Sequence, residues 1–262
     1  MYVVAIDNPS SPGTSVAPVE DLAAALGVSV YDARPHLANT GPRVVALRGD
    51  EADAQRLAHS LAARGFAAYL VGPEQVVPLA SLFCARSFRL GDGRVRGVHR
   101  DGSVLDVDLT SASFLVRGTI VSSTFEKTTS TTTKVAVGRA LLTGGLAVTK
   151  KVTKTTTAET KEREGFLLVR TPAHDMLFRE GDTLYDGLGP KPPATRQAGF
   201  VHLVEALRVG APRAAYDERL TTRPGQHAIL GALLAPEDSL DIAVAVVVAH
   251  LRRARDGAAL GP

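Results

Sequence analysis

The sequence predicts an α+β protein in which a small α/β module precedes a β-rich domain. Two observations predict this class. β-branched runs alternate with amphipathic helical patterns through residue 78, and short strand-like runs separated by Gly-Asp-Gly and Asp-Gly turns follow from residue 79. We therefore divide the chain into an α/β domain (1–78), a β domain (79–220) with an insertion at 121–163, and a linker with an apolar C-terminal helix (221–262).

The first domain is expected to run strand, helix, helix, strand, helix, strand. Apolar side chains recur at helical spacing over 19–26 and 50–64, and a glycine follows each pattern, at Gly27 and Gly65. A short helix between them begins at Ser29, whose side chain can cap exposed amide groups. The expected strands are 2–6, 43–47 and 66–71.

This order and its residues resemble the C-terminal domain of the ribosomal stalk protein and the related fold of the N-end-rule protease adaptor. The matching pieces are a Gly-led helix start at 27–33, a turn at Pro42, a strand at 44–47 and Ala-Arg-Gly-Phe at 63–66. The resemblance covers about 70 residues and rests on core and turn positions. It implies a small α/β module of a kind that binds protein surfaces.

The β domain is expected to hold seven consecutive antiparallel strands closed by one amphipathic helix at 197–209. This arrangement resembles the pleckstrin-homology superfold over residues 83–210, in topology alone. The resemblance implies peptide binding or a scaffold role, and an ordinary small barrel is the alternative. The expected strands are 83–90, 94–100, 103–109, 113–120, 166–170, 175–179 and 183–188.

The insertion differs from the rest of the chain in composition. Six of the seven lysines and two arginines lie within 126–163, and three glutamates reduce the local net charge to +5, against +3 for the whole chain. A basic surface of this kind either is simply solvated or meets an anionic partner. The candidate interaction residues are Lys127, Lys134, Arg139, Leu141, Leu142, Leu146, Lys150, Lys151 and Lys154.

Threonine favours strands, so the two Thr/Lys blocks, 127–134 and 150–161, are expected to lengthen the flanking strands into an arm. The apolar stretch between them, 135–148, contains six branched aliphatic residues and three glycines. It forms either a β-arm tip or a helix. We expect it to be at least half buried, by this chain or by a second copy, because burial stabilises each such side chain by roughly 1.5–3 kcal/mol.

No catalytic, metal or cofactor motif is found. The chain has no phosphate loop, no dinucleotide fingerprint and no nucleophile elbow. Cys84 is the one cysteine, and a small buried residue is expected there. His174-Asp175 is the one histidine next to a carboxylate. We therefore expect no cofactor, no metal and no catalytic residue.

These observations favour a non-enzymatic bacterial interaction, scaffold or adaptor protein, with a protein partner or self-association. The alternatives are peripheral binding to an anionic membrane through the basic insertion, and an enzyme with an unrecognised site. Nucleic acid is disfavoured, because no aromatic residue lies between Phe125 and Phe166 for bases to stack on. The start of the chain lacks signal-peptide features, and no uncharged apolar run nears ~20 residues, so a cytoplasmic location is expected.

Overall fold

The chain divides into two compact units. The computed structural model describes residues 1–8, 19–135, 149–189 and 193–259, with the backbone alone at 122–135, 149–161 and 258–259. The larger unit comprises Met1–Ile120 and Glu164–Pro262, and the smaller comprises Val121–Arg163. Helices and strands are mixed throughout, so the protein is α+β. None of the helices within the described ranges is both long and apolar enough to cross a membrane.

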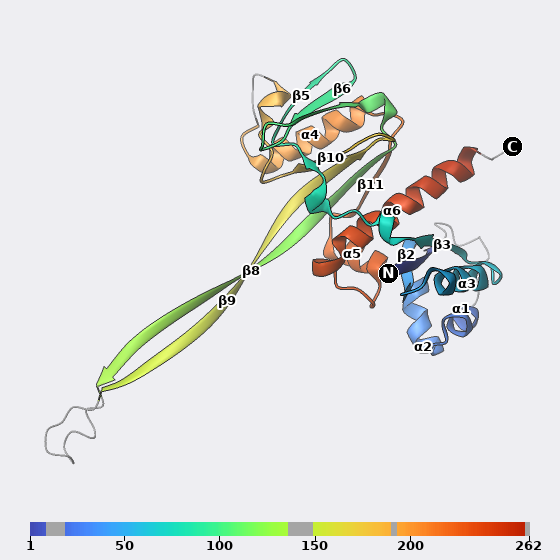
Figure 1. The fold of residues 1–262 in the computed structure, drawn as a ribbon, viewed down its shortest axis with the longest axis horizontal. Helices are drawn as coiled ribbons and strands as arrows, with labels where there is room; N and C mark the ends of the chain where they lie inside the picture. Colours follow the sequence, from blue (N-terminus) through green and yellow to red (C-terminus); the bar gives the residue numbers. More distant parts are fainter. Residues whose placement is uncertain (9–18, 136–148, 190–192, 260–262) are drawn as a thin grey trace, which may run out of the picture. The chain divides into compact units, whose positions relative to one another are not determined.

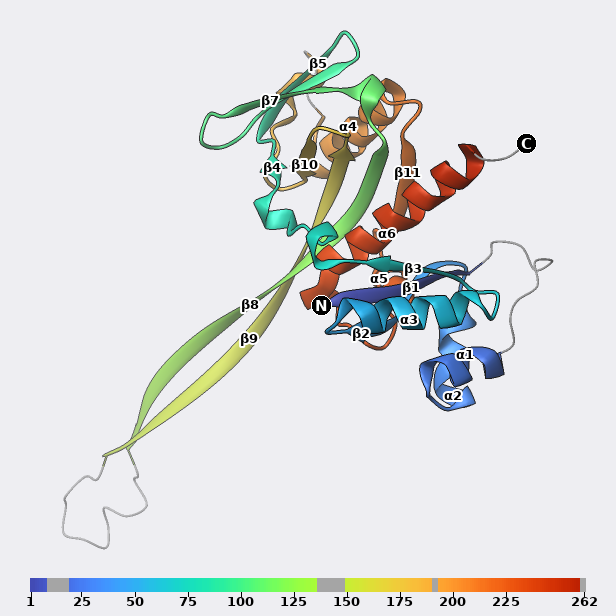
Figure 2. The ribbon, with the colours of Figure 1, turned by 45° about the vertical axis from the view of Figure 1, so that its right-hand side comes forward.

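The first sheet of the larger unit is antiparallel, with the order β2-β1-β3. Alternate side chains of β1 enter different cores: Val4 and Ile6 pack with α1 and α3, whereas Val3 and Ala5 pack on the other side of the sheet. Figure 2 shows α3 against this sheet. The elements, in the predicted order, are β1 (Tyr2–Asn8), α1 (Val19–Leu26), α2 (Val30–Ala33), the 3₁₀ helix η1 (Arg34–Leu37), β2 (Gly41–Arg48), α3 (Glu51–Ala62) and β3 (Ala67–Val71).

The second sheet has five strands in the order β11-β8-β9-β10-β4. Figure 1 labels β8, β9, β10 and β11, and Figure 2 also labels β4. β10 pairs antiparallel with β9, whereas β4 pairs parallel with β10 and β11 pairs parallel with β8. Its two faces alternate like those of the first sheet: Phe114 and Val116 face one core and Leu115 faces the other. The strands are β4 (Phe83–Cys84), β8 (Phe114–Val135), β9 (Thr149–Arg170), β10 (Asp175–Arg179) and β11 (Ala215–Leu220).

A third sheet, β5-β6-β7, and helix α4 share a core with the second sheet. Phe88 of β5 meets Phe178 of β10 edge to face, with ring centroids 5.8 Å apart. From α4, Phe200 and Leu203 enter the same core. The elements are β5 (Ser87–Gly91), β6 (Arg94–Val98), β7 (Val104–Asp108) and α4 (Arg196–Gly210), and the remaining 3₁₀ helices are η2 (Pro73–Gln75), η3 (Leu79–Ser81), η4 (Leu109–Ser111) and η5 (Tyr185–Leu188).

The C-terminal helices α5 (Arg223–Leu230) and α6 (Pro236–Ala259) join the first two sheets. α6 bends at Ser239, where φ is −130° and ψ is 20°. Its apolar residues 243–248 are all buried, in one cluster with Val3 of the first sheet and Phe166 of the second. The apolar C-terminal helix therefore packs against both the first and the second sheet.

The structure differs from the seven-stranded barrel that the sequence predicts, because the described strands form several sheets and none closes into a barrel. The predicted strand 83–90 is split into β4 and β5, which belong to different sheets. The predicted strand at 183–188 is instead the helix η5. At Gly187 this helix lies so close to β5 that a Cβ atom would come within 2.1 Å of the Phe88 carbonyl oxygen.

The insertion is built on two neighbouring strands of 22 residues each, β8 and β9. Both Thr/Lys blocks lie entirely on these strands, which confirms that they lengthen the strands that flank them. Residues 136–148 fall outside the described part of the chain. The burial of the apolar stretch, and the choice between a β-tip and a helix, therefore stay predictions.

We predict that Val247→Ala destabilises the protein by roughly 1–3 kcal/mol, because Val247 is fully buried in α6 and its truncation leaves a cavity. Val209→Ala is the matched control, since Val209 is 72 % exposed on α4, and its effect should stay within about 0.5 kcal/mol. The measurement is chemical denaturation of both variants. Equal effects of the two substitutions would contradict a core built on α6.

Candidate anion-binding groove

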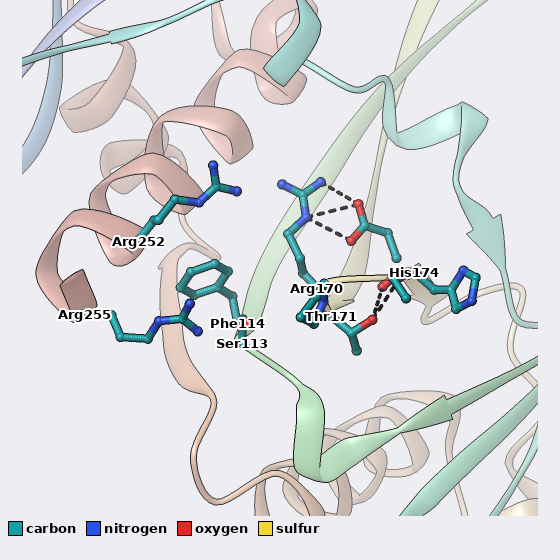
Figure 3. A pocket seen from close by; sticks show the side chains of 10 residues that line it. Ser113, Phe114, Arg170, Thr171, His174, Arg252 and Arg255 are labelled. Carbon is teal, nitrogen blue, oxygen red and sulfur yellow. Dashed lines mark hydrogen bonds and ion pairs between the residues drawn. The ribbon is translucent and has the colours of Figure 1, made fainter. Parts of the chain in front are cut away.

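An arginine-lined groove of about 420 Å³ lies where three segments meet. The start of β8 contributes Ser113 and Phe114, the β9–β10 turn contributes residues 170–175, and α6 contributes Arg252 and Arg255. Figure 3 shows the two α6 arginines on one side of the groove and Arg170, Thr171 and His174 on the other.

The two α6 arginines are positioned by the helix itself. They follow the buried apolar segment at a spacing of three residues, so they share one side of the helix. The Arg255 guanidinium lies 5.5 Å from the centroid of the Phe114 ring, and its ion pair with the neighbouring Asp256 is long, at 4.0 Å. Arg252 is exposed, and its guanidinium has no hydrogen bond or ion pair with any described residue.

On the opposite side of the groove, contacts within the β9–β10 turn hold the side chains in place. Arg170 Nε lies 2.9 and 3.0 Å from the two carboxylate oxygens of Asp175, and Nη2 lies 2.5 Å from Oδ2. Within the turn, the Thr171 hydroxyl donates to the His174 carbonyl at 2.8 Å and accepts from its amide at 2.9 Å. The bidentate pair orients the Arg170 side chain, which is only 16 % exposed.

The groove carries net positive charge, since three arginines face a single aspartate. Guanidinium groups bind carboxylates and phosphates through paired N–H donors. The two residues His174 and Asp175, adjacent in sequence, form no acid–base pair, because the Asp175 carboxylate is engaged by Arg170. The geometry therefore suits the binding of an anion rather than proton transfer.

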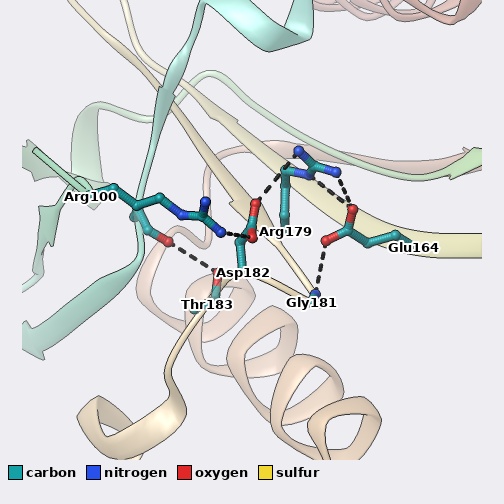
Figure 4. Close-up of polar contacts among 7 residues, drawn as sticks. Arg100, Glu164, Arg179, Gly181, Asp182 and Thr183 are labelled. Carbon is teal, nitrogen blue, oxygen red and sulfur yellow. Dashed lines mark hydrogen bonds and ion pairs between the residues drawn. The ribbon is translucent and has the colours of Figure 1, made fainter. Parts of the chain in front are cut away.

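A second charged cluster lies at the other end of the β9–β10 hairpin, with Arg and carboxylate groups in alternation (Figure 4). Asp182 pairs with both Arg100 and Arg179, and Arg179 also pairs with Glu164, the first residue of the larger unit after the insertion. Glu164 accepts a further bond from the Gly181 amide at 2.9 Å. The two arginines pair with the two carboxylates, so the cluster stabilises this end of the β9–β10 hairpin.

Cys84 lies in a small cavity of about 190 Å³ beside this cluster. Burial raises the pKa of its thiol, and the nearby Asp182 adds to the rise. A nucleophilic cysteine needs the opposite shift. Cys84 is partly buried, whereas a buried residue was expected, and the raised pKa of its thiol does not favour a nucleophilic role.

The strongest acid–base geometry in the described residues lies elsewhere, at a cavity of about 940 Å³ that His250 lines. His250 Nδ1 is 2.9 Å from Asp7 Oδ1, and Arg219 Nη2 is 3.1 Å from His250 Nε2. Arginine only donates, so Nε2 accepts and Nδ1–H donates to Asp7. Arg219 also pairs with the buried Asp217, at 3.1 Å.

This chain of side chains connects β1, α6 and β11. An Asp–His pair of this kind serves as a general base when Nε2 faces a substrate. Here the Nε2 lone pair is occupied by Arg219. The arrangement is therefore best explained as a polar bridge between three elements of the larger unit.

We predict that His250→Ala destabilises the protein by roughly 1–3 kcal/mol, because Asp7 and Arg219 both lose a partner at a largely buried position. His202→Ala, at an exposed position on α4, is the matched control and should be nearly neutral. Thermal and denaturant unfolding of both variants measure the difference. An unchanged stability of the His250 variant would rule out the bridge.

The insertion residues belong to the smaller unit, whereas the residues of the groove belong to the larger unit. The candidate residues on described strands have backbone positions only, on β8 or β9. The remaining candidates lie in 136–148, outside the described residues. Among the residues that the structure does describe, no group of three or more His, Cys, Asp or Glu side chains could hold a metal ion. The candidates on β8 and β9 are Lys127, Lys134, Lys150, Lys151 and Lys154, and those outside are Arg139, Leu141, Leu142 and Leu146.

Only part of the arginine-lined groove could be predicted from the sequence. Two arginines three residues apart at the end of an apolar helical run are a readable sign of a basic helix end. The pairing of Arg170 with Asp175 depends on a turn that sequence periodicity does not specify, and the Asp7–His250 contact spans 243 residues. Comparison of the chain with family models, with curated proteins and with solved structures found no match.

Proposed function

We propose that this protein is a non-enzymatic bacterial adaptor or scaffold that binds an acidic segment of a partner protein in the arginine-lined groove. The observation that carries the proposal is Arg252, an exposed guanidinium without a described partner, next to Arg255 and Arg170. A cation held beside other cations gains electrostatic energy when an anion binds. An open groove with orienting aromatic and turn contacts suits a side-chain carboxylate from an extended segment.

Two features support binding over catalysis. In the Asp7–His250 contact the second ring nitrogen is occupied by Arg219, and burial raises the pKa of the Cys84 thiol. The proposed kinship of the first domain with stalk-like and adaptor-like modules, and of the β domain with the pleckstrin-homology superfold, agrees with protein binding. We extend the proposal to a cytoplasmic location.

We predict that Arg252→Gln/Arg255→Gln weakens the binding of a fluorescein-labelled hexaglutamate peptide at least tenfold, because each charge-assisted hydrogen bond contributes about 1.5–3 kcal/mol. Arg56→Gln/Arg64→Gln is the matched control, since it removes the same charge from two exposed arginines, one on α3 and one in the turn that follows it. Fluorescence anisotropy measures the affinities.

Equal losses in both double variants would mean that only net charge matters, and the groove would be rejected. Competition by inorganic phosphate as effective as by hexaglutamate would assign the groove to phosphate instead. Added salt should weaken the wild-type interaction, as expected for charges near the surface. Unchanged thermal unfolding of the variants would confirm that the loss is one of binding.

A second candidate function is docking of the basic insertion onto an anionic membrane. The specific observation is that β8 and β9 are hydrogen-bonded neighbours, so the two lysine-rich blocks belong to one two-stranded ribbon. Lysines near an anionic membrane surface gain about 1 kcal/mol each. The local excess of five positive charges would then be the basis of attraction.

We predict that the protein co-sediments with phosphatidylserine-containing vesicles and not with phosphatidylcholine vesicles. Replacing the five strand lysines of the candidate set by glutamine should abolish co-sedimentation, whereas Arg252→Gln/Arg255→Gln should leave it intact. A pellet that lacks the protein with both vesicle types would eliminate this second function. The five lysines are Lys127, Lys134, Lys150, Lys151 and Lys154.

A further inference from the structure

The outer face of the third sheet presents two arginines directly opposite each other. Arg89 of β5 and Arg96 of β6 are register partners, and both are exposed. Asp106 of β7 is the partner of Arg96 on the other side, but its carboxylate is hydrogen-bonded to Arg94 at 2.9 Å. Like charges directly opposite in a sheet are destabilising, so this pair costs stability as it stands.

Apolar side chains lie one step further along the same face. Val98 of β6 pairs with Val104 of β7, and Val104 is 48 % exposed. Leu184, which precedes η5, is 47 % exposed, and its amide is tied to the Arg86 carbonyl at 2.6 Å. Exposed apolar side chains gathered in this way are typical of binding surfaces.

These residues line one groove of about 780 Å³ between β5, β6, β7 and the segment 184–189. Asp186 and Gly187 also line the groove, and the single carboxylate of Asp186 leaves it with one net positive charge. The groove lies on other elements than the arginine-lined groove and shares none of its residues. This groove would therefore recognise a charged group and an apolar group together, whereas the arginine-lined groove would recognise a charged group.

The spacing of the side chains on this face of the sheet indicates which kind of peptide can bind. Arg96 and Val98 are two residues apart on β6, which places their side chains about 6.8 Å apart on the same face. An extended peptide repeats its side chains at the same interval. An acidic side chain would lie between Arg89 and Arg96, and an apolar side chain two residues away would reach Val98, Val104 and Leu184.

We propose that this groove binds an extended segment of a partner protein in which an acidic residue and a large apolar residue are two positions apart. Binding relieves the repulsion between the two arginines and covers the exposed apolar side chains in the same step. Recognition of alternate side chains of an extended segment is an established way for sheets to bind peptides. The proposal does not depend on the anion-binding groove.

The test uses the full-length protein labelled with ¹⁵N and two synthetic peptides of the same composition. One is acetyl-Gly-Ser-Glu-Ser-Leu-Ser-Gly-amide, with the acidic and apolar residues two apart, and the other is acetyl-Gly-Ser-Ser-Glu-Leu-Ser-Gly-amide, with the two residues adjacent. We expect the first peptide to bind several-fold more tightly. Its addition should shift the amide resonances of β5, β6 and the residues around Leu184.

Two variants separate the contributions of charge and apolar surface. Arg89→Gln/Arg96→Gln and Val104→Ser/Leu184→Ser should each weaken the first peptide roughly tenfold, whereas Arg252→Gln/Arg255→Gln should have no effect. Arg56→Gln/Arg64→Gln controls for net charge. Equal binding of the two peptides, shifts that map to Arg252 and Arg255, or binding of inorganic phosphate with equal shifts would each overturn the proposal.

Discussion

The larger unit depends on the burial of α6 between two sheets. Residues 243–248 of this helix are buried in one continuous cluster, which includes Val3 and Val71 from the first sheet and Phe114 and Leu168 from the second. Full burial of each valine stabilises the fold by roughly 1.5–3 kcal/mol. Neither sheet could expose this face to water without losing that contribution, so the two sheets and the helix are expected to form together.

The same helix places both polar arrangements described above. In its C-terminal turns, His250 and Arg253 contact Asp7 of β1. Arg252 and Arg255, in the same turns, line the arginine-lined groove beside Phe114. The helical period of 3.6 residues separates the two pairs onto different sides. Movement of this helix would therefore alter the polar bridge and the groove at the same time.

Local sequence patterns predicted the elements whose structure depends on near neighbours. β1, α3 and the apolar α6 follow from strand alternation, helical spacing and a continuous apolar run. The patterns could not predict the parallel pairs β4–β10 and β8–β11, because each joins strands that are distant along the chain. The turn-rich segment before residue 190 was expected to continue as a strand. It forms η5 because Gly187 allows close contact with the Phe88 carbonyl oxygen.

Two glycines allow close packing of β8 and β9 near the boundary between the two units. At Gly118 of β8, a Cβ atom would come within 2.4 Å of the Phe166 ring, and at Gly165 of β9 it would come within 2.9 Å of the Phe200 ring. Both aromatic side chains are buried, so β8 and β9 are packed tightly in the larger unit next to its boundary with the smaller unit. Glu164 adds its bonds to Arg179 and Gly181 at the same place. The three described core clusters consist of residues of the larger unit.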